Sequence, residues 1–261
     1  MQNLKVAFIQ SDLVWHNAEE NRNNFSQKIN HINEEVDLII LPEMFTTGFS
    51  MHPKNISENV NGKTINWMKK VASSKNTAIT GSIIIEENDS YFNRLLFVHP
   101  SGKIETYNKR HLFSLAGEEK VYTAGTKKKI FNLKGWKICP QICYDLRFPV
   151  FSRNTEDYDL LFYIANWPNQ RIIAWDALLK ARAIENMSYV IGVNRVGKDA
   201  NNFEYSGHSV AFDGLGELIG NVIPYKEETI IVNLNKEELF ATRKKLNFLS
   251  DKDNFTLQLP I

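Results

Sequence analysis

Cysteine is scarce in this sequence of 261 residues, which contains only Cys139 and Cys143. Two cysteines in a chain of this size do not make the disulfide framework of a small secreted domain. The first ten residues, MQNLKVAFIQ, have one short apolar run and lack the shape of a signal peptide. We therefore expect a cytoplasmic protein in which Cys143 remains a free thiol, and we assign Cys139 to the core.

An excess of charge and long apolar runs are also missing. The 31 lysines and arginines balance 30 acidic residues, so the formal net charge is +1 and nothing favours nucleic acid or an anionic membrane as a partner. No apolar stretch approaches the roughly 18 to 20 residues that cross a bilayer. The glycine-rich segment 213–217 lies between two predicted strands, which favours a hairpin turn over half of a dinucleotide-binding fingerprint.

What the chain does contain is a regular alternation of apolar patterns. Strands are predicted at 4–10, 36–43, 77–85, 91–98, 103–107, 136–142, 158–166, 188–196 and 207–213. Helices are predicted at 18–36, about 62–75, 172–183 and 235–245. Residues 110–126 lack a clear period and are expected to form a long loop, which in a compact domain indicates function.

These elements indicate an α/β fold with mixed sheets. Several neighbouring strands are joined by tight turns, whereas others are separated by helices. Strands that are apolar on both faces, with only a few helices, favour two sheets that pack together and are covered by helices outside. We expect one domain over residues 1–261, with a core at about 4–235 and a C-terminal tail at 236–261.

Cys143 ends an apolar strand where the chain changes direction, which suits a nucleophile because the sheet holds its backbone while the side chain is exposed. The backbone N–H groups that follow can stabilise an oxyanion. By position alone, however, an isolated cysteine is more often a small core residue. None of the six histidines follows a strand with an evident acidic partner, so a cysteine–histidine pair has little support.

Glu43 ends one predicted strand, and Lys109 follows another. A carboxylate that leaves an apolar strand is partly desolvated, which raises its pKa toward values useful for proton transfer. A lysine ammonium is a compact charge suited to an oxyanion. Each residue, taken singly, is more often a surface side chain.

The three residues together resemble a known family. The segments LPEMFTTGFSM around Glu43, YNKRHLF around Lys109 and ICYDLRFP around Cys143 occur in the order found in the nitrilase superfamily, the carbon–nitrogen hydrolases. The resemblance spans about residues 4–235. It implies a four-layer αββα sandwich, usually paired into a homodimer, and a mechanism without a metal or organic cofactor. It also implies that Glu43 is the general base, Lys109 the stabiliser of the tetrahedral intermediate and Cys143 the nucleophile.

Within the superfamily the chain is most similar to bacterial ω-amidases, which hydrolyse the terminal amide of small ω-amido 2-oxo acids such as 2-oxoglutaramate and 2-oxosuccinamate. The segment Cys143-Tyr144-Asp145 departs from the Cys-Trp-Glu that is usual in true nitrilases, which argues against nitriles. The resemblance also implies an assisting carboxylate beyond the lysine. Glu118 is at the matching place, although the neighbouring Glu119 is an alternative and both could be exposed loop residues.

Candidate substrate-binding residues are Tyr144, Trp167 and Arg171. Trp167 follows a strand end and could form the wall of a small pocket, and the Arg171 guanidinium could bind a carboxylate with two hydrogen bonds. Arg171 could instead decorate the following helix, and Arg147 is interpreted as a brace of the nucleophile turn through a buried ion pair. One alternative is a different substrate, namely a carbamoyl amine, a ureido acid or a deaminated peptide fragment. The other is a non-catalytic protein that binds a small amide.

Overall fold

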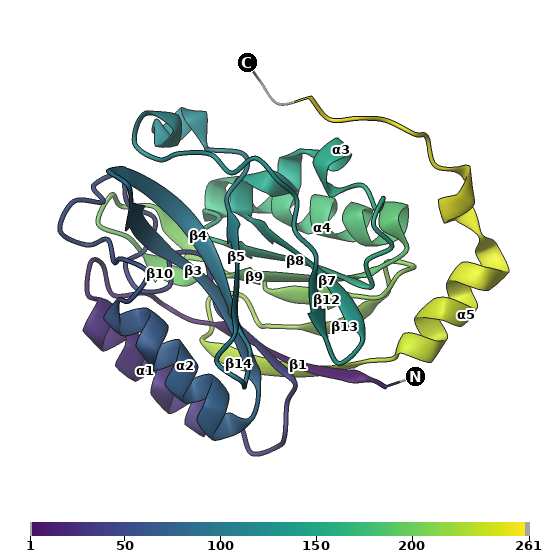
Figure 1. The fold of residues 1–261 in the computed structure, drawn as a ribbon, viewed down its shortest axis with the longest axis horizontal. Helices are drawn as coiled ribbons and strands as arrows, with labels where there is room; N and C mark the ends of the chain where they lie inside the picture. Colours follow the sequence, from purple (N-terminus) through teal and green to yellow (C-terminus); the bar gives the residue numbers. More distant parts are fainter. Residues whose placement is uncertain (1, 259–261) are drawn as a thin grey trace.

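The computed structural model describes residues 2–258, which form two six-stranded mixed sheets packed face to face (Figure 1). In spatial order, the first sheet contains β14 (Glu228–Leu234), β1 (Leu4–Gln10), β2 (Leu38–Ile40), β3 (Ala78–Glu87), β4 (Ser90–Val98) and β5 (Ile104–Asn108). The second contains β13 (Leu218–Asn221), β12 (Val210–Phe212), β9 (Tyr189–Asn194), β8 (Leu160–Ala165), β7 (Trp136–Ile142) and β6 (Phe131–Leu133). A separate hairpin pairs β10 (Val196–Lys198) with β11 (Glu204–Ser206).

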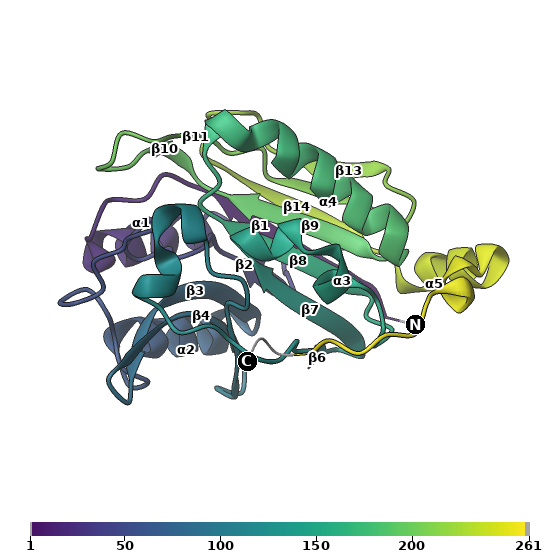
Figure 2. The same cartoon turned by 90° about the horizontal axis from the view of Figure 1, so that it is seen from above.

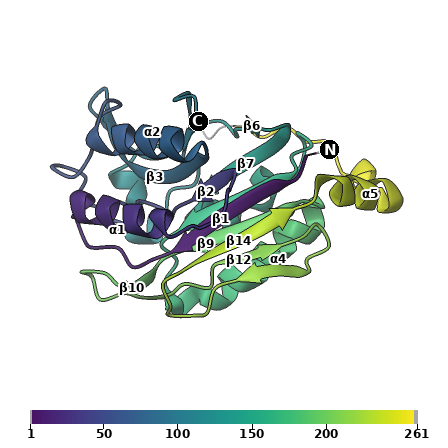
Figure 3. The ribbon, with the colours of Figure 1, turned by 90° about the horizontal axis from the view of Figure 1, so that it is seen from below.

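Helices cover the outer faces of both sheets, so the expected four-layer αββα sandwich is confirmed (Figure 2). The helices α1 (Ala18–Asn30) and α2 (Lys63–Lys75) lie on the first sheet, and α3 (Pro149–Ser152) and α4 (Ile172–Asn186) lie on the second. The last helix, α5 (Lys236–Leu246), stands at the end of the molecule opposite α1 (Figure 3). It begins the expected tail, of which residues 259–261 lie outside the described residues.

The central strands β2 and β8 are apolar along their whole length because both of their faces are buried. In β1, Val6 and Phe8 join the core between the two sheets, whereas Ala7 and Ile9 join the core beneath α1 and α2. The same alternation in β8 places Phe162 between the sheets and Tyr163 under the outer helices. Cys139 is fully buried, in accordance with its assignment to the core.

Most predicted elements are present, and the differences have local causes. The first helix ends at Asn30 rather than at 36. Ile32 and Val36 pack on the same core from an irregular segment, so the apolar pattern extends beyond the end of the helix. The strand predicted at 36–43 is reduced to β2, and the loop at 110–126 contains two short 3-10 turns, η1 (Ser114–Ala116) and η2 (Glu118–Lys120). The hairpin turn expected at 213–217 is present between β12 and β13, whereas β10, β11 and β14 were not predicted as separate strands.

Among the helices formed by residues 2–258, none combines the length and the apolar character that a membrane span requires.

Candidate active site

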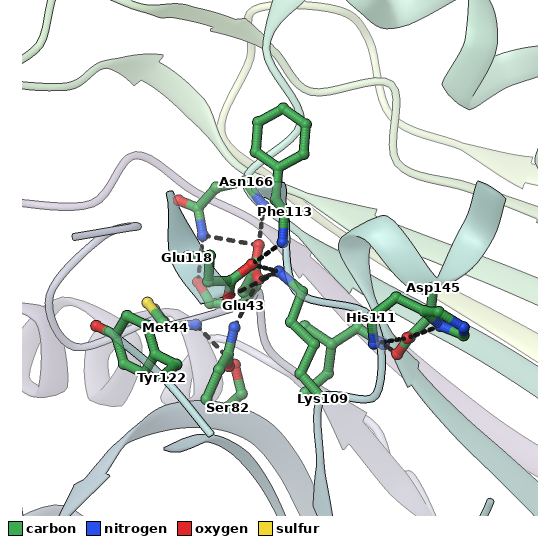
Figure 4. Close-up of polar contacts among 12 residues, drawn as sticks. Glu43, Met44, Ser82, Lys109, His111, Phe113, Glu118, Tyr122, Asp145 and Asn166 are labelled. Atoms are coloured by element: carbon green, nitrogen blue, oxygen red, sulfur yellow. Dashed lines mark hydrogen bonds and ion pairs between the residues drawn. The ribbon is translucent and has the colours of Figure 1, made fainter. Parts of the chain in front are cut away.

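Strand ends from both sheets bring Glu43, Lys109 and Cys143 to one place. Glu43 follows β2, Lys109 directly follows β5, and Cys143 directly follows β7 of the other sheet. Because the two sheets pack face to face, their strand ends meet at one edge of the sandwich. Figure 4 shows Lys109 between the carboxylates of Glu43 and Glu118, which comes from η2 in the long loop.

The chain turns sharply at the candidate nucleophile. Cys143 has a φ of 46°, in the left-handed region, and begins a 3-10 turn, η3 (Cys143–Arg147). A residue other than glycine in this region costs about 1–3 kcal/mol and persists only where its surroundings hold it. The Asp145 carboxylate accepts a hydrogen bond from the backbone N–H of Ile142 (3.0 Å), which closes the turn.

Glu43 is fully buried, and protein donors surround its carboxylate. Oε1 accepts hydrogen bonds from Asn93 Nδ2 (2.8 Å) and Lys109 Nζ (3.0 Å), and Oε2 accepts one from the backbone N–H of Asn166 (2.8 Å). The next residue, Met44, has a φ of 43° and donates its N–H to Ser82 Oγ (2.9 Å). These contacts fix the carboxylate at the start of a turn and satisfy its charge away from water.

Lys109 lies between two carboxylates with its side chain completely buried. Its Nζ donates to Glu43 Oε1 (3.0 Å) and to both oxygens of Glu118 (3.0 and 2.8 Å). Burial alone would lower the pKa of Lys109, but the charges of Glu118 and Glu43 outweigh it and raise the pKa above its ordinary value. The ammonium therefore stays charged. Burial also raises the pKa of Glu118, which Lys109 partly offsets.

The thiol of Cys143 is partly open to a cavity but otherwise surrounded by protein. Its pKa is raised well above the ordinary value, first by burial and then by the negative charge of Glu43, whereas Lys109 acts in the opposite direction. A raised pKa keeps the sulfur protonated at neutral pH. The site therefore contains a thiol beside a carboxylate rather than a preformed thiolate, and nucleophilic attack needs a base at that position.

A cavity of about 340 Å³ opens from Cys143. Its walls are largely aromatic and include Trp15, Phe49, Phe113 and Tyr205. Asp199 is the one carboxylate among the described residues that line it, and this carboxylate already accepts hydrogen bonds from Tyr205 Oη (2.9 Å) and from two backbone N–H groups.

Two arginines line the same cavity, and each guanidinium lies over an aromatic ring. Arg147 lies over Trp167 (5.0 Å) and Arg171 over Phe113 (5.2 Å). Within residues 2–258 neither guanidinium has a carboxylate partner. Stacking on a ring orients a guanidinium while its N–H groups remain available. The lining of the cavity therefore contains two positive charges with unused hydrogen-bond donors.

The structure brings together the residues that the sequence singled out. Glu118 contacts Lys109, whereas Glu119 is exposed, which favours Glu118 as the assisting carboxylate. Tyr144, Trp167 and Arg171 all line the cavity. Although Arg171 precedes α4, its side chain makes no capping hydrogen bond to that helix.

Two interpretations from the sequence are wrong. Arg147 is exposed at the cavity and does not form the buried ion pair that we expected. Three histidines do have acidic partners, since His99 contacts Glu105, His208 contacts Asp176, and His111 Nδ1 lies 2.8 Å from Asp145 Oδ1, but none of the three lines the cavity. Asp145 comes from the nucleophile turn, far from His111 in sequence, so no local pattern could have indicated the pair.

Further residues of the site were not identified from the sequence. Asn93 and the backbone of Asn166 bind Glu43, and Trp15 forms part of the cavity wall. Asn166 belongs to a strand-end segment that the sequence did mark, but its contact with Glu43 depends on how the two sheets pack. Among residues 2–258, no three His, Cys, Asp or Glu side chains are grouped so that they could hold a metal ion.

Comparison with known proteins extends this description. The sequence model of the family described as Carbon-nitrogen hydrolase matches residues 5–244. The chain is 44% identical to the omega-amidase YafV of Yersinia enterocolitica over 98% of this chain and 100% of that protein. It is 31% identical to the 2-oxoglutaramate amidase of Bacillus subtilis over 94% and 96% of the two chains. A crystal structure of a CN-hydrolase superfamily protein from Xanthomonas campestris, with an arsenic adduct in its active site, superimposes with a TM-score of 0.96 at 38% identity and covers 99% and 100% of the chains.

Proposed function

Because the chain belongs to the carbon–nitrogen hydrolase family and is a hydrolase that acts on amides, we propose that it is an ω-amidase that releases ammonia from the terminal amide of a small 2-oxo acid. The preferred substrates are 2-oxoglutaramate and 2-oxosuccinamate. The observation that carries the assignment is the pair of guanidiniums, Arg147 and Arg171, which line the cavity that opens from Cys143 and have no carboxylate partner among the described residues.

The reaction begins at Cys143, which is the nucleophile. Its sulfur attacks the amide carbonyl carbon while Glu43 takes the thiol proton, as the raised pKa of the thiol requires. Negative charge develops on the carbonyl oxygen, and Lys109 Nζ and the backbone N–H of Tyr144 stabilise it. Glu118 holds Lys109 in place through two short contacts.

The tetrahedral intermediate collapses when the carbon–nitrogen bond breaks. The leaving nitrogen receives the proton held by Glu43 and departs as ammonia, which leaves a thioester on Cys143. Glu43 then takes a proton from water as the water oxygen attacks the thioester carbon. The carbon–sulfur bond breaks, the acid is released, and the proton returns to the sulfur.

The charge of the cavity selects an acid at the far end of the substrate. A carboxylate between Arg147 and Arg171 would receive charge-assisted hydrogen bonds, which contribute more than neutral ones. Since the stacked guanidiniums are already oriented over Trp167 and Phe113, little conformational freedom is lost when the substrate binds.

The same charges disfavour an amino acid amide. The ammonium of glutamine would face two guanidiniums, and the one carboxylate of the described lining, Asp199, is already engaged with Tyr205 and with backbone N–H groups. Like charges and an unpaired cation both reduce affinity. A 2-oxo group carries no charge and can accept hydrogen bonds, so the cavity favours the 2-oxo acid.

The test is ammonia release from a panel of amides at equal concentration. We expect kcat/KM for 2-oxoglutaramate to exceed that for glutamine by roughly 100-fold or more. The ammonium of glutamine would be repelled by the guanidiniums and left without a partner, which costs a few kcal/mol of binding free energy. Ureido acids and simple nitriles belong in the same panel. Faster turnover of a ureido acid than of either 2-oxo acid amide would refute the assignment.

We further propose that the enzyme acts as a homodimer in the cytoplasm. Val150 on α3 and Ile173 on α4 are exposed apolar side chains (51% and 82%) on the outer helical layer, where a second copy would extend the sandwich. A reducing compartment keeps the Cys143 thiol free for catalysis. Sedimentation equilibrium should give twice the mass of the 30.1 kDa chain, and a monomer at micromolar concentration would rule out a stable dimer.

A further inference from the structure

Asp145 forms a buried link between the turn that carries Cys143 and the segment that carries Lys109. It is fully buried and accepts four hydrogen bonds from three residues. Oδ2 accepts from the backbone N–H of Ile142 (3.0 Å) and from Tyr107 Oη (2.6 Å), and Oδ1 contacts both the backbone N–H (2.9 Å) and Nδ1 (2.8 Å) of His111. Figure 4 shows the pair of contacts to His111 beside the Lys109 side chain.

The residues that bind Asp145 are close in sequence to both Cys143 and Lys109. Ile142 directly precedes Cys143, and Tyr107 and His111 lie two residues before and two residues after Lys109. One carboxylate therefore connects strand β7 of the second sheet to the end of β5 in the first. We propose that Asp145 is a positioning residue that sets the separation between the Cys143 sulfur and the Lys109 ammonium.

The need for such a link follows from the strain at the nucleophile. The left-handed backbone of Cys143 is unfavourable by itself, and the hydrogen bond from the Ile142 N–H to the Asp145 carboxylate helps to hold the turn in place. The reacting groups come from different sheets, so a small shift between the sheets would separate them. Misplacement of a reacting group by about 1 Å can cost roughly 100-fold in rate.

The outer partners of the link are also fixed. His111 stacks on Phe148 with ring centroids 3.7 Å apart, and Tyr107 Oη accepts the backbone N–H of Arg110 (3.2 Å). Every donor around Asp145 is therefore held by a second contact or by a strand. This inference rests on the proposed roles of Cys143 and Lys109 and adds a residue that touches neither substrate nor sulfur.

The test compares two phenol deletions. Tyr107→Phe removes one hydrogen bond from Asp145, whereas the control Tyr163→Phe removes an equally buried hydroxyl from a contact with Ser152 (2.8 Å) outside the link. We expect Tyr107→Phe to lower kcat roughly tenfold with KM within about twofold, and Tyr163→Phe to leave both unchanged. Asp145→Asn, which places an amide N–H against existing donors, should lower kcat roughly 100-fold if it folds.

A second pair of variants separates the hydrogen bond of His111 from its stacking. His111→Asn retains an N–H donor near the position of Nδ1 but loses the ring, whereas His111→Phe retains the ring against Phe148 and loses the donor. Our proposal requires that His111→Asn retain most of the kcat of the unmodified enzyme and that His111→Phe have a reduced kcat. The reverse order would mean that packing alone matters.

A readout that needs no substrate distinguishes this inference from the assignment of function. Iodoacetamide alkylation of Cys143, measured against pH, reports how the charges of Glu43, Lys109 and Glu118 act on the thiol. If Tyr107→Phe lets Lys109 move away, the midpoint should shift to higher pH, because Lys109 favours the thiolate. An unchanged midpoint together with an unchanged kcat, even with a lowered Tm, would overturn the proposal.

Discussion

The charges behind Cys143 and the charges that line the cavity, which we call the inner and the outer end of the site, differ in how they are satisfied. At the inner end the completely buried Lys109 ammonium binds the buried carboxylates of Glu43 and Glu118. At the outer end Arg147 and Arg171 are at least partly exposed, and within residues 2–258 they have aromatic neighbours but no carboxylate partner. The inner charges are thus arranged before substrate arrives, whereas the outer charges are left for the substrate to pair.

This difference separates chemistry from recognition. Buried charges that are fully hydrogen-bonded cannot reorganise cheaply, and removing one leaves its partner uncompensated. Such preorganised groups stabilise a transition state. Stacked, partly exposed arginines act on ground-state and transition-state binding alike, because the carboxylate of the substrate is far from the reacting bond. Variants at the inner end should therefore change kcat, and variants at the outer end should change KM.

The largest effect is expected at the nucleophile itself. Cys143→Ala should reduce kcat for 2-oxoglutaramate by at least about 10⁴-fold, because no other group can form the acyl intermediate. Cys139→Ala is the matched control, since Cys139 is fully buried in the core and should retain kcat. Ammonia release measured on both variants decides the matter, and appreciable activity in Cys143→Ala would remove the basis of the mechanism.

Glu43→Gln should reduce kcat by about 10³-fold, since general base catalysis is worth about 10²–10⁴-fold. The same substitution should make the thiol more acidic. The Glu43 carboxylate raises the pKa of Cys143, so its removal lowers that pKa and shifts iodoacetamide alkylation to lower pH.

Lys109→Met should move the pKa of Cys143 in the opposite direction. The Lys109 charge lowers the pKa of Cys143, so its loss should shift alkylation to higher pH while kcat again falls. A pair of variants that both lose activity but move the thiol in opposite directions cannot be explained by general unfolding. Alkylation profiles that moved in the same direction would contradict this view of the inner end.

Glu118 and Glu119 offer a comparison between adjacent residues. Glu118→Gln removes the carboxylate that contacts Lys109 through both oxygens and also accepts the backbone N–H of Phe113 (2.6 Å). We expect kcat to fall roughly 30- to 100-fold as Lys109 loses its orientation. Glu119→Gln changes an exposed residue and should leave kcat within about twofold. Equal effects of the two substitutions in a kinetic assay would disagree with this arrangement.

The sequence was sufficient to predict those residues whose signal is local. Glu43, Lys109 and Cys143 each follow a strand, and strand ends can be read from a period of two and from the turn residues after them. Together they formed a recognisable pattern that implied both the sandwich and the mechanism. Arg171 could also be named, because a small acid needs a cation and this arginine lies just beyond a strand end.

Contacts between distant segments could not be predicted in this way. β14 pairs antiparallel with β1 although the two strands are at opposite ends of the chain, and no local pattern specifies that register. Asp145 was overlooked because its partners, Tyr107 and His111, come from the other sheet. Arg147 was misinterpreted for a related reason, since only the packing of Trp167 beside it reveals a cavity rather than a buried ion pair.

The smallest effects are expected at the outer end of the site and should appear in KM. Arg147→Met and Arg171→Met should each raise KM for 2-oxoglutaramate roughly tenfold with kcat nearly unchanged, because each removes about one charge-assisted hydrogen bond to the substrate carboxylate. Arg171→Lys keeps the charge but loses the planar fork and should be intermediate. Lys70→Met, which removes an exposed charge from α2, is the control for net charge.

A neutral amide makes this last prediction decisive. Propionamide has no carboxylate, so its slow hydrolysis should be indifferent to both arginine variants, although it should still depend on Cys143. Steady-state kinetics on both substrates would then place recognition at the guanidiniums and chemistry at the thiol. If the arginine variants slowed both substrates equally, the two ends of the site would not be separable, and Arg147 and Arg171 would act by holding the nucleophile turn.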